Sequence, residues 1–301
     1  VNNLINNQVT ALANRSNNPQ AVFQDSLTST LYPGNPVFRT MTVDEVKSVN
    51  YDRALELGKQ LFGNAKDYTF FFVGNFDEAK ILPLIKQYIA SLPSNGKKFK
   101  NVETLPVKGE VVNKFTKAME NPQDVALENW CSEAPYTLRN SVLADIAARV
   151  INMDYNRNIR EKLSAAYYAG ADAMESVKLD GKTMRVGVTG NAMMNPDKSK
   201  DAIPYFYSGL KDAMEQPNLD DLQKVKEILL KQADVSCKQN GYWMGVISEY
   251  LLYGIDTHTN YKKEVSSVDA KAVSDFLKNV VMKDGNHVEV IMHATKAGEA
   301  K

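Results

Sequence analysis

The sequence predicts an α+β fold made of two units. Three observations lead to this prediction: helical and strand patterns are mixed along the chain, a turn-rich stretch divides it, and its 301 residues suit two domains of ~150 residues each. Apolar residues make up 44% and charged residues 24%, which is typical of a globular protein. A disordered or low-complexity chain is therefore excluded.

The first part is predicted to be mainly helical. A long helical stretch is broken near Pro19, which suits a first helical position because its ring presets φ. Thr42 and Glu45 have the spacing of a capping box, in which each side chain satisfies a backbone N–H of the other residue, so a helix is expected to begin there. The other predicted helices cover about residues 1–31, 51–62 and 78–91.

Residues 68–73 (YTFFFV) form a continuous apolar and aromatic run, which predicts a strand buried on both faces. The stretch 93–108 is rich in turn-forming and basic residues, and we interpret it as a linker.

Beyond the linker, strands and helices are mixed. Asp180-Gly181 supplies the positive φ of a hairpin turn between two of the strands. Strands are predicted over about residues 110–116, 124–131, 166–176, 183–190 and 288–292. Helices are predicted over about 136–153, a shorter segment reaching 163, 197–215, 219–239, 242–253 and 268–280.

A weak internal repeat indicates that the two units are related. A helix and turn over residues 23–34 and the strand over 68–73 recur in the same order at 247–254 and 288–292. Short patterns of this kind also recur by chance. If the units are related, residues 1–95 are the C-terminal part of one unit, 96–108 the linker and 109–301 a complete second unit.

The charge balance argues against a nucleic-acid partner, and the short apolar runs argue against a membrane span. Lys+Arg and Asp+Glu each total 36, and no basic block is present to follow a phosphate backbone, so nucleic acid is not expected as a partner. The longest apolar runs fall far short of the ~18 residues that span a bilayer, so no transmembrane helix is expected. The chain opens with neither Met nor a signal sequence, and we expect it to be part of a longer protein.

Common catalytic and metal motifs are missing from the sequence. The two cysteines, Cys131 and Cys237, lack C-x-x-C spacing and are interpreted as buried thiols. None of the three histidines has a second histidine one helical turn away, as helical zinc motifs require. No nucleophile elbow or phosphate-binding loop follows a predicted strand.

The histidines are better explained as ordinary polar residues than as metal ligands. His287 and His293 share one strand face with Glu289, because even spacing in a strand places side chains on the same side. We interpret them as polar positions near the strand ends rather than as a metal site. His258 is interpreted as a solvated loop residue.

Three stretches resemble the pitrilysin/insulinase family of zinc metallopeptidases. Residues 70–77 (FFFVGNFD) with the following helix resemble the family's strand-helix signature, and 159–167 (IREKLSAAY) its Arg-x6-Tyr element. Residues 240–256, which begin NGYWM, resemble a late helical hairpin of the bacterial members. The likeness extends over residues 18–293, with the motifs in the family's order.

The resemblance implies a fold and an assembly. Members of the family contain four homologous α/β-sandwich units, each an antiparallel-rich sheet covered by helices, in two halves that close like a clamshell around a peptide. Residues 1–95 would be the C-terminal part of the third unit, and 109–301 the whole fourth unit. The implied partners are an N-terminal zinc-binding half, fused or separate, and a peptide substrate.

The resemblance also implies a divided active site. The family's zinc motif, H-x-x-E-H, belongs to the first unit and is absent here, so this chain is expected to bind no metal and to be inactive alone. Arg160 and Tyr167 match the family's Arg and Tyr, which would bind the substrate carbonyl and the oxyanion. Without the resemblance, Arg160 would be a surface ion pair with Glu161 or Asp154, and Tyr167 a half-buried strand residue. Tyr168 is expected to face the core or an interface.

Two other functions are compatible with the sequence. Relatives that have lost the zinc motif act as structural or chaperone-like subunits, and a third reading is a module that adds extended peptides to a sheet edge. Many bacterial relatives are exported, so the resemblance implies the periplasm as the compartment.

Overall fold

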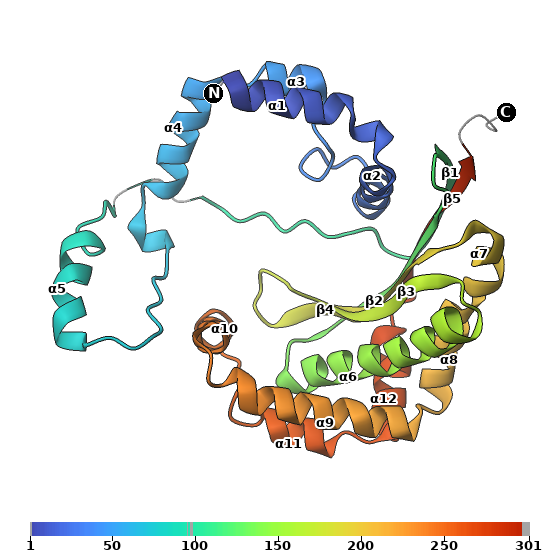
Figure 1. The fold of residues 1–301 in the computed structure, drawn as a ribbon. Helices are drawn as coiled ribbons and strands as arrows, with labels where there is room; N and C mark the ends of the chain where they lie inside the picture. The colour runs from blue at the N-terminus through green and yellow to red at the C-terminus, as the bar shows by residue number, and fades with distance from the viewer. Residues whose placement is uncertain (1, 95, 97–98, 297–301) are drawn as a thin grey trace.

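The computed structural model describes residues 2–94, 96 and 99–296 (Figure 1). Five strands form one mixed sheet: β1 (Glu110–Met119), β2 (Asp124–Pro135), β3 (Ala166–Val177), β4 (Thr183–Met194) and β5 (Asn286–Lys296). Their order is β1-β5-β2-β4-β3, with β1 and β5 parallel and all other neighbours antiparallel. The predicted α+β fold with an antiparallel-rich sheet is therefore confirmed.

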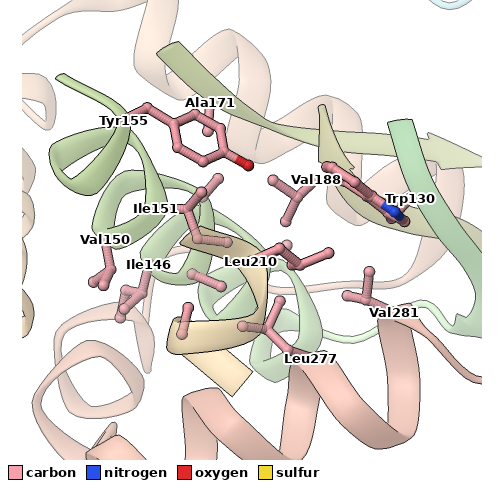
Figure 2. Close-up of a cluster of buried hydrophobic side chains, with 14 of the residues drawn as sticks. Trp130, Ile146, Val150, Ile151, Tyr155, Ala171, Val188, Leu210, Leu277 and Val281 are labelled. Carbon is pink, nitrogen blue, oxygen red and sulfur yellow. The ribbon is translucent and has the colours of Figure 1, made fainter. Parts of the chain in front are cut away.

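A layer of helices covers one face of this sheet (Figure 1). The hydroxyl of Thr137 accepts a hydrogen bond from the backbone N–H of Asn140, which caps the first helix of the layer. Aliphatic side chains of this helix meet those of β4 in the core drawn in Figure 2. The layer consists of α6 (Leu138–Tyr155), α8 (Pro204–Glu215), α9 (Leu219–Ser236) and α12 (Ala270–Phe276), which continues into the π-helix η4 (Leu277–Val281).

The last residue of α6 is held in a slot of the core. The ring of Tyr155 is fully buried and packs edge-on against Phe206 with the ring centroids 5.0 Å apart. Its hydroxyl donates to the carbonyl of Phe206 at 2.8 Å. Gly190 and Gly209 border the slot, since a Cβ at either position would approach the ring to within 2.9 Å or less. This slot fixes the point at which α6 ends and the segment beginning at Asn156 follows.

The opposite face of the sheet is partly covered by α2 (Pro19–Leu31), which packs against β1 and β5 and lies beside them in Figure 1. Leu27 packs in a small second core with Val288 and Val290. The side-chain amide of Asn113 donates to the hydroxyls of Ser26 and Thr30 at 2.9 and 2.7 Å. As predicted, Pro19 begins this helix.

The remaining N-terminal helices follow the sequence prediction closely. Thr42 and Glu45 form the predicted capping box. The helices are α1 (Asn2–Ala13), η1 (Arg15–Asn17), α3 (Val43–Lys47), α4 (Tyr51–Phe62), η2 (Ala65–Asp67) and α5 (Glu78–Tyr88).

Residues 68–73 are not a buried strand, and this prediction was wrong. The segment is extended, but within the described residues no other segment pairs with it, and Tyr68, Phe70 and Phe72 are exposed. A strand exists only when a neighbour accepts and donates its backbone hydrogen bonds, and the apolar pattern alone cannot supply that neighbour.

Further corrections concern the second part. The predicted helix over 197–215 is two helices, α7 (Pro196–Ala202) and α8, because Pro204 begins a new one. Helix α11 (Tyr261–Ser267) was not predicted, while α10 (Asn240–Tyr253) was. Cys131 is buried as predicted, but Cys237 is only half-buried. In the described part of the chain, no helix combines the length and apolar character needed to cross a membrane.

Candidate functional site

Arg160 projects from a π-helix, η3 (Asn156–Lys162), that continues directly from α6. Its neighbour Ile159 is fully buried, so Arg160 is directed to the surface. Asp154 holds the segment in place by accepting hydrogen bonds from the side-chain amide of Asn158 at 2.9 and 3.0 Å and from Arg157 at 3.3 Å. π-helical turns are rare and often occur at functional sites.

The turn between η3 and β3 is fixed by an unusual backbone and one lysine. Ser164 has φ of 47°, in the left-handed region that non-glycine residues seldom adopt. The ammonium group of Lys198 donates to the carbonyls of Leu163 and Ser164 at 2.9 and 3.2 Å. The backbone N–H of Ala165 donates to the carbonyl of Ile159 at 3.0 Å. Arg160 and the start of β3 are thus held in one rigid turn.

Tyr167 is the extra residue of a β-bulge. Ala166 lies opposite Met194 and Tyr168 lies opposite Met193, so Tyr167 has no partner residue on β4. Bulges redirect a side chain from its regular direction in the sheet. Tyr167 is accordingly 91% exposed.

Arg160 and Tyr167 meet at a surface hollow. The central guanidinium carbon of Arg160 lies 5.7 Å from the centre of the Tyr167 ring, within the range of a cation–π contact. Both side chains line a hollow of about 690 Å³, together with Gln123, Met193 and Asn195. The structure therefore brings the two predicted site residues together and leaves both accessible.

The two alternatives that did not depend on the resemblance are wrong: Arg160 makes no described ion pair with the expected acids, and Tyr167 is 91% exposed rather than half-buried. Among the described ion pairs, Arg160 pairs with neither Glu161 nor Asp154, because Asp154 is engaged by Arg157 and Asn158. Tyr168, which was expected to face the core or an interface, is half exposed, and its hydroxyl lies over Gly170.

A comparison with known families identifies the fold. Residues 48–229 match the family described as Peptidase M16 inactive domain. This chain belongs to that family. The resemblance to the pitrilysin/insulinase zinc metallopeptidases is thereby confirmed, and the M16 domain matched is one that the family description calls inactive.

Two curated proteins are similar to this M16 chain. The "Zinc protease PQQL-like" of Arabidopsis thaliana is 22% identical over 245 residues, which cover 76% of this chain and 25% of that protein. The "Probable zinc protease PqqL" of Escherichia coli (strain K12) is 27% identical over 168 residues, which cover 54% of this chain and 18% of that protein. The chain thus spans a quarter or less of the length of these relatives.

One solved structure shows the same fold over nearly the whole chain. The periplasmic protease PqqL from Escherichia coli superimposes with a TM-score of 0.78 at 18% identity, over 97% of this chain and 32% of that one. At 18% identity this likeness shows that the two chains share a fold.

The described residues of the M16 chain do not fit a zinc ion. Within them, no group of three or more His, Cys, Asp or Glu side chains is placed to hold a metal. His287 instead bonds to Glu128 at 2.8 Å, and His293 to Asp124 at 2.9 Å.

His287 lies near the start of β5, as expected, but it belongs to a buried polar network, whereas His293 is partly exposed. Glu289 accepts from the hydroxyl of Tyr207 at 2.7 Å and pairs with Lys114 at 2.6 Å, and His287 stacks on Trp130 with ring centroids 5.1 Å apart. Sequence reasoning missed Glu128, because only the pairing of β2 with β5 places it opposite Glu289.

His258 was predicted to be a solvated loop residue, and this is also wrong. It is half-buried, its ring centroid lies 4.7 Å from that of Trp243, and its Nδ1 is 2.7 Å from the hydroxyl of Tyr242. Both aromatic residues come from α10, which precedes His258 in the chain. The histidine thus links the loop to the end of that helix.

The pKa of Glu128 is strongly raised. Its side chain is fully buried, and burial raises its pKa to about 7, with the carboxylate of Glu289 adding to the shift and the hydrogen bond to His287 opposing it. Burial alone would lower the pKa of His287, but the bond to Glu128 and the nearby carboxylates raise it.

These shifts predict a pH-dependent stability. Both pKa values are raised, so the folded state binds more protons than the unfolded state, and the free energy of unfolding is expected to fall from pH 5 to pH 8. The pKa of Glu289 is lowered, so this carboxylate stays ionised in the folded state from pH 5 to pH 8 and adds little to the change in stability. Glu128→Gln should reduce the fall by roughly 1–3 kcal/mol, measured by urea unfolding at both pH values. An identical fall in the wild type and the variant would contradict this assignment.

Proposed function

We propose that this chain is the zinc-free, substrate-binding part of a zinc metallopeptidase that cleaves peptides inside a clamshell chamber. Arg160 and Tyr167 complete an active site whose metal and general base lie in an N-terminal half, fused or separate. The observation that carries the proposal is the bulge that leaves Tyr167 91% exposed beside Arg160, at the position of the family's Arg-x6-Tyr element.

The two side chains suit distinct roles toward a bound peptide. The guanidinium of Arg160 is always charged and offers several N–H donors, which suits it to bind substrate carbonyl oxygens. The phenol of Tyr167 donates one hydrogen bond, which is most valuable when it meets an oxygen that gains negative charge in the transition state. The rigid turn around Ser164 would keep both donors aligned without reorganisation during the reaction.

The proposed domain arrangement follows the sequence prediction. Residues 1–95 form the C-terminal part of a third unit, 96–108 a linker and 109–301 the fourth unit. The unpaired extended segment 68–73 and the exposed apolar side chains of α4, including Leu55 and Leu61, support this arrangement, because a sheet contributed by the remainder of the third unit would cover them.

The free edge of β3 favours a particular way of holding the peptide. Within the described sheet, β3 pairs only with β4, and no strand occupies its other edge next to Tyr167. Further along this edge, the backbone N–H of Ala171 donates to the side-chain oxygen of Asn152 at 3.2 Å. An extended peptide can add to such an edge as a further strand. For the compartment, the relative described as a periplasmic protease supports the periplasm.

The proposal is tested with a quenched fluorescent peptide and a parallel zinc assay. This chain alone is compared with the same chain joined to its zinc-binding half. Hydrolysis and bound zinc are expected only in the joined form. If the joined form neither binds zinc nor cleaves peptides, the chain is instead a structural or chaperone-like subunit.

A further inference from the structure

We propose a second site on the sheet face that points away from the helix layer, where Arg185 binds the terminal carboxylate of a peptide with an apolar last residue. The inference goes beyond the proposed function, because it concerns the end of β3 opposite to Tyr167. Ten residues of strand, about 33 Å, separate Tyr167 from Val177 at that end. The site does not require that the chain take part in hydrolysis.

Arg185 is a buried cation without a carboxylate partner. It lies in β4 and is only 5% exposed. Its two terminal nitrogens donate to the carbonyl of Pro106 at 3.2 Å and to the sulfur of Cys131 at 3.0 Å. Among the described residues, no Asp or Glu lies within 4.0 Å of the guanidinium. Buried charges are normally paired, and a bound anion would supply both the opposite charge and stronger acceptors.

The acidic residue nearest to Arg185 in the sheet is Glu133, and it already interacts with lysines. Glu133 lies directly opposite Arg185 on β2, but its carboxylate binds Lys178 at 3.2 Å and lies 4.0 Å from Lys108. Glu103 likewise lies 4.0 Å from Lys178. The cations of Lys108, Lys178 and Arg185 thus face the carboxylates of Glu103 and Glu133. Glu175 also borders the cavity, but its side chain interacts with Ser141 of α6, so the remaining positive charge favours an anionic ligand.

A cavity of suitable size adjoins the guanidinium. It measures about 440 Å³ and lies between the sheet, the end of α2 and the chain segment 102–106. This volume suits one or two residues of a peptide. Its apolar walls include Leu27, Leu31, Leu105, Leu127 and Met174. A carboxylate attached to an apolar side chain satisfies both features of the cavity, which identifies the carboxyl end of a peptide as the ligand.

Binding is tested with a fluorescently labelled Ala-Leu-Leu peptide, prepared as the free acid and as the C-terminal amide. Fluorescence anisotropy with the full chain is expected to show at least about tenfold tighter binding of the acid, as a charge-assisted hydrogen bond implies. Arg185→Gln should abolish the difference. Lys182→Gln, which removes an exposed charge in the turn between β3 and β4, should leave it unchanged.

A second variant tests the site without removing Arg185. Glu133→Gln takes away the nearest competing carboxylate and is expected to tighten binding of the free acid, so the test stands even if Arg185→Gln fails to fold. Equal affinity for acid and amide, or an unchanged preference in Arg185→Gln, would overturn the proposal. Preferential binding of an amidated Ala-Leu-Glu peptide would overturn the assignment to peptide ends. None of these results depends on the activity of Arg160 or Tyr167.

Discussion

Tyr167→Phe, made in the protein that also carries the zinc-binding half, is expected to lower kcat for peptide hydrolysis about 10²–10³-fold. The substitution removes one phenolic donor but keeps the aromatic ring that Arg160 contacts at 5.7 Å, so substrate binding should change little. Steady-state hydrolysis of a fluorescent peptide gives kcat and KM separately. Zinc content, measured on the same samples, should equal that of the wild type.

Two comparisons make the Tyr167 result specific. Tyr168→Phe removes the neighbouring phenol, which also borders the hollow but has its hydroxyl over Gly170, and should retain wild-type kcat. Arg160→Ala should raise KM as well as lower kcat, because a guanidinium that binds substrate carbonyls acts in the ground state too. Full activity of Tyr167→Phe would show that the phenolic hydroxyl takes no part in the mechanism.

Tyr155→Ala is expected to have the largest effect on stability, lowering the free energy of unfolding by about 3–5 kcal/mol. The ring is fully buried against Phe206, and its loss leaves a cavity that Gly190 and Gly209 cannot fill because they have no side chains. Urea unfolding of the whole chain, followed by circular dichroism, measures the change.

Tyr155→Phe provides the matched control. It keeps the ring and removes only the hydrogen bond to the carbonyl of Phe206, so the loss should be about 1 kcal/mol. Since η3 continues from Tyr155, the alanine variant should also disorder the segment that carries Arg160. A loss below 1 kcal/mol for Tyr155→Ala would show that the slot closes around the missing ring.

Local signals predicted most elements of the fold. The capping box at Thr42, the break at Pro19 and the hairpin at Asp180-Gly181 each depend on residues a few positions apart, and the structure has all three. The segment 68–73 was mispredicted because strand formation depends on a partner, and no local pattern reveals whether one is present.

The candidate site was only partly predictable for the same reason. Residue spacing and the family resemblance point to Arg160 and Tyr167, but regular alternation gives no indication that Tyr167 is displaced by a bulge. The pairs His287–Glu128 and Arg185–Pro106 join residues 159 and 79 positions apart. Such contacts arise from the order of strands in the sheet, which short sequence patterns do not encode.

The bulge at Tyr167 and the π-helix that carries Arg160 share a property that makes both sensitive to the deletion of a single residue. Each is one residue longer than its regular counterpart, since a π turn spans one residue more than an α turn and a bulge adds one residue to a strand. Loss of a single codon in either element would rotate one donor away from the hollow while the packed layers on either side kept their register. A single-residue deletion in either element is therefore expected to separate the paired donors without rebuilding the core.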